Sequence, residues 1–152
     1  MKVSFSSIRK MFIGKQEPVS PAPDCEDERQ IAEMAMMLHI FMRTHKPYLI
    51  RGYSIYQLSE ETNISLPDLV AILEQQKYAG YNDLIDNYRI DYCLTYLEHT
   101  PARTIDVLDL MFFCGFADKN EFCATFKKIT HFKLEKYIRK LQRQHIQGDG
   151  AD

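Results

Sequence analysis

The sequence predicts an all-α protein. Apolar residues recur three or four positions apart in one segment after another, which is the spacing of helices that bury one face. Polar residues suited to capping a helix precede these segments, and no segment alternates apolar and polar residues between hairpin turns as a strand would. Hydrophobic residues make up 45% of the 152 residues and charged residues 26%, which is typical of a folded chain and excludes a collagen-like or wholly disordered one.

The first 25 residues are expected to form a flexible arm and a Pro-rich linker. Residues 1–15 mix apolar with basic side chains, and Pro18, Pro21 and Pro23 then prevent a continuous helix. We expect the amphipathic segment to dock on the body of the protein or on a partner or sensor protein.

No segment has the pattern of a membrane or secretion signal. Arg9 and Lys10 interrupt the start of the chain, which lacks the long apolar stretch of a signal peptide. No apolar run approaches the roughly 18 residues of a membrane-spanning helix. The sequence therefore predicts a cytoplasmic protein that does not contact a membrane.

A helix is predicted to begin at Glu26, ahead of the repeated part of the chain. Acidic residues fill its first turn and suit the positive end of the helix dipole. Its buried side is expected to consist of apolar residues at helical spacing: Ile31, Met34, Ala35, Leu38, Phe41 and Met42.

Two short helices are predicted beyond Pro47. Ser54 caps the first, and Gln57 three residues later completes a capping box. Asn63 suits the left-handed turn that ends this helix. Ser65 caps the second helix, whose buried side is expected to consist of Leu69, Ile72 and Leu73.

Four more helices are predicted, and the first of them, Tyr81–His99, is the longest. The others begin at Asp106, Asp118 and Leu134. Gly115 suits the end of the helix that follows Asp106, and the last helix is expected to end at Gln144. The buried residues of these helices are expected to include Ile85, Ile90, Cys93, Leu97, Leu110, Phe122 and Phe126.

One pattern of helix, turn and helix occurs twice. Asp106 follows Ser54 by 52 residues, and Gly115 follows Asn63 by the same distance. Each copy has a capped helix, a residue suited to a left-handed turn, and a second helix with its own apolar side. These are the requirements of two helices that cross over a shared small core. We therefore predict two helix-turn-helix units, joined by the long helix over residues 81–99.

These residues resemble the DNA-binding domain of AraC/XylS-type transcriptional regulators. The resemblance is closest to the C-terminal domain of sensor-regulators, which opens with Lys-Pro-Tyr-Leu, here residues 46–49. The other shared motifs are Tyr81-x-Asp83-Leu84-Ile85-Asp86-x-Tyr88-Arg89-Ile90, Val107-Leu108-Asp109-Leu110, Gly115-Phe116, Phe122, Phe126-Lys127-Lys128 and Tyr137. The resemblance implies a homeodomain-like, double helix-turn-helix domain, which we place over residues 26–145. We expect a disordered tail over residues 146–152.

The resemblance also implies a sequence-specific transcriptional regulator that binds double-stranded DNA. In a helix-turn-helix the second helix enters the major groove, where its exposed residues meet base edges. The base-facing candidates are Pro67, Asp68, Ala71 and Gln75 in the first unit and Lys119, Asn120, Cys123 and Ala124 in the second. The candidates for phosphate contacts are Thr104, Lys127, Lys128, Lys133 and Lys136. Arg89 is predicted to be a structural strut held by acids such as Asp86 or Glu61.

The charge distribution leaves a second function open. The net charge is −2, whereas DNA-binding domains are usually basic. Residues 54–76 contain four acids and no Lys or Arg, while bases are concentrated between Lys133 and Arg143. The Ser-Arg pair usual in the family is replaced by Val70-Ala71 and Cys123-Ala124. The alternative is a degenerate family member that acts as a protein-interaction module or antagonist. If the protein binds DNA, the second unit is expected to dominate.

Enzyme and metal chemistry are not predicted. The sequence has no Gly-rich phosphate loop and no G-x-S-x-G motif. The four cysteines lack the spacing of zinc ligands, and three of them lie among apolar residues, where a reduced cysteine packs as a small hydrophobe. We therefore expect no cofactor, no metal site and no disulfide.

Overall fold

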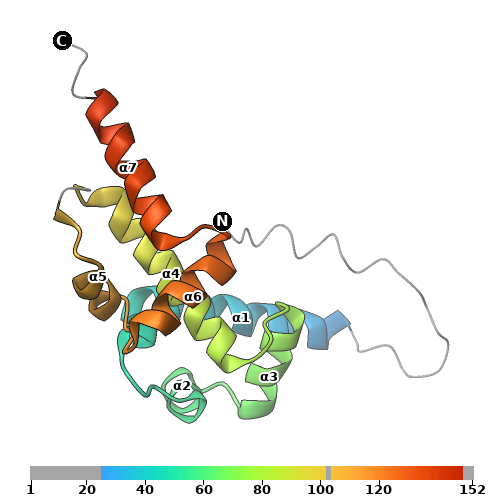
Figure 1. The fold of residues 1–152 in the computed structure, drawn as a ribbon. Coiled ribbons are helices and arrows are strands. Elements are labelled where there is room, and N and C mark those ends of the chain that lie inside the picture. Colours follow the sequence, from blue (N-terminus) through green and yellow to red (C-terminus); the bar gives the residue numbers. More distant parts are fainter. Residues whose placement is uncertain (1–24, 102–103, 149–152) are drawn as a thin grey trace.

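The computed structural model describes residues 25–101 and 104–148, and the regular elements among these residues are all helical, with no strand (Figure 1). The helices are α1 (Cys25–His45), η2 (Pro47–Leu49), α2 (Ile55–Thr62), α3 (Leu66–Gln75), α4 (Tyr81–His99), α5 (Val107–Phe113), α6 (Lys119–Thr130) and α7 (Leu134–Gly148). The all-α prediction is confirmed. None of the helices in these ranges has the length and apolar character needed to span a membrane.

The first and last helices have slightly different bounds from those predicted. Helix α1 begins at Cys25, and the rest of the predicted arm lies outside the described residues. Helix α7 continues to Gly148, so residues 146–148, which we expected in a disordered tail, are helical. The sequence offers no glycine or proline between Leu134 and Gln147 to stop the helix earlier. The remainder of the predicted tail lies outside the described residues.

The buried side chains form two clusters, and α4 contributes to both. The first cluster is built by α1, η2, α2, α3 and the start of α4, where Leu84 and Ile85 are buried. The second is built by α5, α6, α7 and the rest of α4, where Ile90, Cys93 and Leu97 are buried. Helix α4 therefore serves as the shared wall of two small cores, with α2 packed on α3 in one half and α5 on α6 in the other (Figure 1).

The helix boundaries follow the predicted caps. The side chains of Ser54, Ser65, Asp106 and Asp118 each accept a hydrogen bond from a backbone N–H in the first turn of α2, α3, α5 and α6. The Ser54 and Gln57 pair forms the complete capping box. Asn63 ends α2 in the left-handed conformation with φ 56°, and Gly115 follows α5 with φ 82°. These local predictions are confirmed.

The η2 segment ties the two halves of the protein together. The Nε of Arg89 on α4 donates a hydrogen bond of 2.7 Å to the backbone oxygen of Tyr48, and the guanidinium of Arg89 lies over the ring of Phe116, 5.3 Å from its centroid. Arg89 is thus a strut, but its hydrogen-bond partner is this carbonyl rather than the acids we expected. The carbonyl groups of so short a helix lack intrahelical donors and can therefore accept a hydrogen bond from the guanidinium.

Gly115→Ala is expected to destabilise the protein much more than Gly52→Ala. Both glycines have positive φ, so alanine adds backbone strain of about 1–2 kcal/mol at either position. A Cβ on Gly115 would also lie 3.0 Å from the Tyr48 oxygen and 3.1 Å from the Leu49 Cα, whereas one on Gly52 would meet nothing within 4 Å. Thermal unfolding of the two variants checks this. Equal shifts would mean that η2 does not pack against this turn.

Candidate nucleic-acid interface

The outward face of α3 carries no base. Pro67, Val70 and Glu74 are exposed along it, and the predicted reading residues Ala71 and Gln75 are half-buried beside them. A face with an acid and no cation repels phosphate groups, because affinity for DNA comes largely from neutralising them.

Asp68 takes part in the N-terminal cap of α3. The hydroxyl of Ser65 donates a hydrogen bond of 2.6 Å to Oδ2 of Asp68, and the backbone N–H of Asp68 donates one of 3.2 Å to the same hydroxyl. The carboxylate therefore has one oxygen engaged within the helix cap. To read a cytosine amino group it would have to use the other oxygen or give up the cap.

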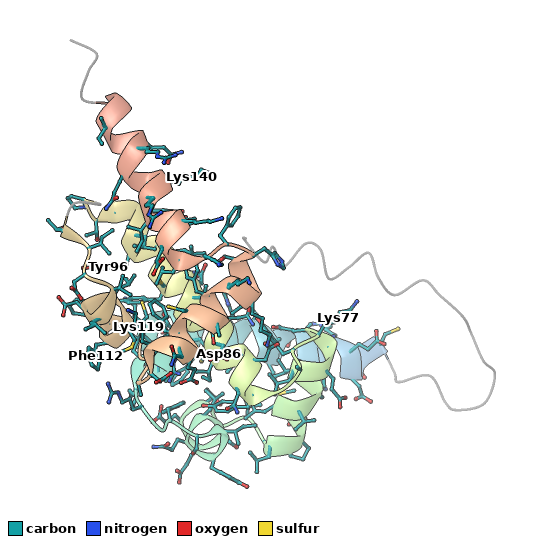
Figure 2. The ribbon with its side chains drawn as sticks, viewed as in Figure 1. Lys77, Asp86, Tyr96, Phe112, Lys119 and Lys140 are labelled. Atoms are coloured by element: carbon teal, nitrogen blue, oxygen red, sulfur yellow. The ribbon has the colours of Figure 1, made fainter. Side chains whose placement is uncertain are left out.

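The outward face of α6 is better suited to a nucleic acid. Lys119, Asn120, Ala124 and Lys127 are exposed on it, and Cys123 is half-buried at its edge. Beneath this face, Phe122 and Phe126 anchor the helix in the second core. The structure therefore keeps an amide and two ammonium groups together on one side of a firmly packed helix. Figure 2 shows Lys119 at the start of α6, close to α5.

The starts of α5 and α6 are occupied by carboxylates. Oδ1 of Asp106 accepts hydrogen bonds from the N–H groups of Leu108 and Asp109, at 2.7 and 3.1 Å. Oδ1 of Asp118 accepts one of 2.8 Å from the N–H of Glu121. A negative side chain already fills the place that a phosphate takes at a free helix N-terminus. Phosphate contacts by these backbone groups are thus disfavoured.

Thr104 lies just before α5 and is exposed. Its hydroxyl donates a hydrogen bond of 2.8 Å to the backbone oxygen of Pro101. A hydroxyl has one proton, so Thr104 would have to leave Pro101 in order to donate to a phosphate.

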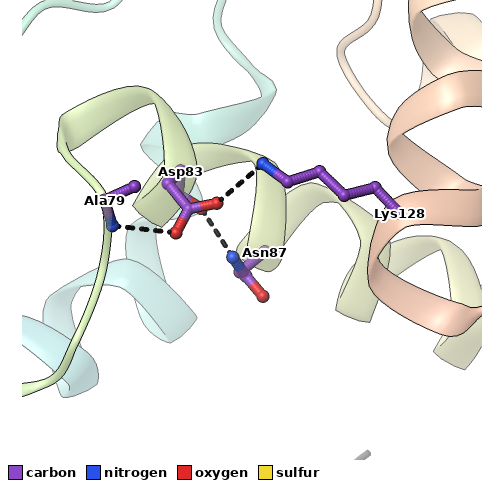
Figure 3. Close-up of polar contacts among 4 residues, drawn as sticks. All are labelled: Ala79, Asp83, Asn87 and Lys128. Atoms are coloured by element: carbon purple, nitrogen blue, oxygen red, sulfur yellow. Dashed lines mark hydrogen bonds and ion pairs between the residues drawn. The ribbon is translucent and has the colours of Figure 1, made fainter.

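Lys127 and Lys128, adjacent in sequence, differ in their surroundings. The Nζ of Lys128 lies 3.4 Å from Oδ1 of Asp83 on α4 (Figure 3). Oδ2 of Asp83 accepts a hydrogen bond of 3.1 Å from the N–H of Ala79, which fixes the carboxylate. Lys127 is exposed on the side of α6 that faces away from the core. The two predicted phosphate ligands are therefore not equivalent.

A second carboxyl group, that of Asp86, lies three residues after Asp83 on α4. Burial raises the pKa of Asp86 above its ordinary value, Arg89 opposes the rise, and Glu121 adds to it. Asp83, Asp86 and Lys128 border a shallow hollow together with Ala79, Gly80, Tyr81 and Asn82. The hollow is open, and its one cation, Lys128, is already paired with Asp83, so it does not resemble a pocket for an anion.

Helix α7 carries a basic ridge that we define as Lys136, Arg139, Lys140 and Arg143. All four side chains are exposed, and their spacing of three or four residues places them opposite the buried Leu134 and Ile138. The last turns of α7 extend beyond the other helices (Figure 1), and Figure 2 shows Lys140 on this outer stretch. Lys133, just before α7, is exposed as well.

Three members of the basic ridge were missing from the predicted site. Arg139, Lys140 and Arg143 were visible in the sequence only as part of a basic segment. A helical projection of residues 134–148 would have found them, because Lys136 shares their face of the helix. Helices α6 and α7 pack against each other, and both carry exposed cations, Lys127 on α6 and the ridge on α7.

The predicted site residues thus fall into two groups separated by α4. The group on α3 is acidic or neutral, and the group on α6 and α7 is basic. No cluster of three or more potential metal ligands occurs within residues 25–101 and 104–148. The thiols of Cys93 and Cys114 are buried, and a hydrogen bond with Cys114 together with burial raises the pKa of Cys93, which makes it a poor nucleophile.

Comparisons of the chain with protein-family models, with curated proteins and with solved structures found no match.

Proposed function

We propose that the protein is a sequence-specific, double-stranded DNA-binding transcriptional regulator of the AraC type. In this proposal α2 with α3 and α5 with α6 are two helix-turn-helix units, and α4 is the linking helix. Helix α6 enters the major groove and reads bases, and cations of α6 and α7 hold the phosphates. The observation that carries the proposal is the set of exposed cations on α6 and α7, together with the exposed Asn120 on α6.

The repeated design of the two helix pairs supports the assignment. Each pair has a capped first helix, a left-handed turn residue and a second helix that buries one face in its own core. The turn of the second pair is longer, since α5 ends at Phe113 and α6 begins at Lys119, whereas Thr62 and Leu66 bound the first turn. Two crossing helices around a short turn are the architecture that places one helix in a groove.

The charges of the two units support different roles in DNA binding. Between Lys119 and Arg143 there are eight Lys or Arg residues and two acids, against four acids and no bases between Ser54 and Gln76. Each cation that reaches a phosphate releases condensed counterions, which favours binding. We therefore assign DNA contact to α6 and α7 and leave α3 outside the interface or at its edge.

A second function is favoured by the acidic first unit. Helix α3 exposes Leu66 and Val70 near Glu74, with no cation among the residues of α2 and α3. An acidic, partly apolar helix face suits a basic protein surface better than a phosphate backbone. The alternative is thus a protein-interaction module or antagonist in which the first unit makes the contact.

Asn120→Ala is expected to relax the preference for one base pair and leave the salt dependence of binding unchanged. An asparagine can form two hydrogen bonds with adenine, and loss of such a pair costs about 1–3 kcal/mol of discrimination. Selection of bound duplexes from a randomised pool, followed by titration over a salt series, measures both quantities. Asn82→Ala is the matched control, because Asn82 is an exposed asparagine at the start of α4. An unchanged preference in Asn120→Ala would remove α6 as the reading helix.

A further inference from the structure

The outer side of α1 carries three large apolar side chains that are each more than half exposed. Met36 and Met37 are each 60% exposed, and Ile40 is 53% exposed. The opposite side of the same helix packs against α3 and is buried at Ala35, Leu38 and Met42. Helix α1 is thus apolar on both sides, although only one side is covered within the described residues.

The arrangement of the three side chains indicates a contact surface. Residues three and four positions apart on a helix share a face, and Ile40 lies four positions after Met36 and three after Met37, so the three residues form one stripe. Apolar residues scattered singly over a surface are ordinary, but a contiguous stripe on an unpartnered helix face marks an interaction site. Methionine is frequent in such sites because its flexible side chain adapts to its partner.

The charges at the two ends of the stripe are opposite in sign. Glu33 lies one turn before Met36, and Arg43 lies one turn after Ile40. If two copies of α1 pack antiparallel about a two-fold axis, Met36 of one faces Ile40 of the other. In that same register, Glu33 faces Arg43 at both ends. A parallel pairing would set like charges against each other.

We propose that the α1 stripe of Met36, Met37 and Ile40 is a self-association surface, through which two copies of this chain form an antiparallel, two-fold symmetric dimer. A two-fold interface requires a surface that is complementary to itself, and the stripe with its opposite charges at the two ends meets this requirement. The inference goes beyond the proposed function and does not depend on DNA binding.

The existing ion pairs of the flanking residues are compatible with the dimer. Nε of Arg29 lies 3.1 Å from Oε1 of Glu33, and Nη1 of Arg43 lies 3.7 Å from Oδ2 of Asp91. Both pairs are well exposed and contribute little on their own. A carboxylate accepts several hydrogen bonds and a guanidinium donates five, so Glu33 and Arg43 can keep these partners and also pair across the interface.

The size of the surface predicts a weak dimer. One helix face buries less than the roughly 1,200–2,000 Å² of a standard stable interface. We therefore expect a dissociation constant on the order of 10 μM, where association is visible only at high protein concentration.

Sedimentation velocity of the full chain without DNA tests the proposal. From about 1 to about 300 μM, the parent is expected to move from monomer to dimer. Met37→Glu and Ile40→Glu would bring like charges together inside the interface, and each should weaken association at least about tenfold. Tyr56→Glu is the matched control, because Tyr56 is an exposed large side chain on α2, away from α1. It should associate like the parent.

Exchanging the charges of Glu33 and Arg43 distinguishes the proposed antiparallel dimer from other modes of association. Glu33→Arg and Arg43→Glu should each weaken the dimer, and the double variant should restore it because the two charges face each other in both orders. A parent that stays monomeric at every concentration would overturn the proposal, including the case in which residues 1–24 cover the stripe. A dimer that persists in Met37→Glu and Ile40→Glu would equally overturn it, because its interface would lie elsewhere.

Discussion

Phe122→Ala is expected to lower the free energy of unfolding by about 3–5 kcal/mol. The Phe122 side chain is fully buried at the centre of the second core. Its ring centroid lies 5.1 Å from that of Phe116 and 6.5 Å from that of Phe126. The substitution removes the ring that all of these contacts share and leaves a cavity that the surrounding helices cannot fill completely. The loss is a large part of the roughly 5–15 kcal/mol that stabilises a typical domain.

Thermal or urea unfolding followed by circular dichroism measures the loss. Phe132→Ala is the matched control, since Phe132 is 55% exposed between α6 and α7. This control should change the free energy of unfolding by well under about 1 kcal/mol. If Phe122→Ala unfolded at the same temperature as the control, α6 would not be anchored in the core as described.

Lys127→Glu is expected to weaken DNA binding more than Lys128→Glu. Both substitutions change the net charge equally and lie side by side on α6, so each is the control for the other. Lys127 faces solvent on the outward side, whereas the ammonium of Lys128 is held 3.4 Å from Asp83. We therefore expect only Lys127 to contact a phosphate directly.

The two variants should also differ in salt dependence. Loss of one phosphate contact makes the slope of log K against log salt shallower by about 0.9. We expect this change for Lys127→Glu, with affinity reduced about tenfold or more for all sequences at low salt. For Lys128→Glu we expect a smaller loss and nearly the parent slope. Equal slopes for the two variants would mean that the Asp83 pair opens when DNA binds.

Local features of the fold were predictable because each depends on a few neighbouring residues. The caps at Ser54, Ser65, Asp106 and Asp118 need only a side-chain oxygen before an apolar helix, and their positions are confirmed. The bounds of α4 at Tyr81 and His99 also match the prediction. Apolar periodicity identified the buried faces for the same reason, since it is a property of one helix at a time.

Contacts between distant segments were not predictable in the same way. The Arg89 side chain has acids nearby in sequence, yet it binds the oxygen of Tyr48, 41 residues away. The pairing of Lys128 with Asp83 spans 45 residues and changes the expected role of one predicted ligand. Both contacts depend on how α4 is placed against η2 and α6, which the pattern of a single helix does not encode.

The outward faces of α1 and α7 were predictable only in part. The exposed stripe of α1 overlaps in sequence with the predicted buried stripe, because Met36 and Met37 lie among Met34, Ala35 and Leu38. Apolar residues this dense fit more than one helix face, so the sequence identified the helix but not that two of its faces are apolar. The basic ridge of α7 was assigned only in part for a similar reason, since five cations within eleven residues conceal which ones share a face.

Titration of a labelled genomic duplex with the parent protein over a salt series tests the proposed function most directly. With four or five phosphate contacts from α6 and α7, we expect tight binding at low salt and a slope of about −4 in log K against log salt. A protein that is folded by circular dichroism and yet binds no duplex at low salt would contradict DNA binding. That result would favour the protein-interaction module.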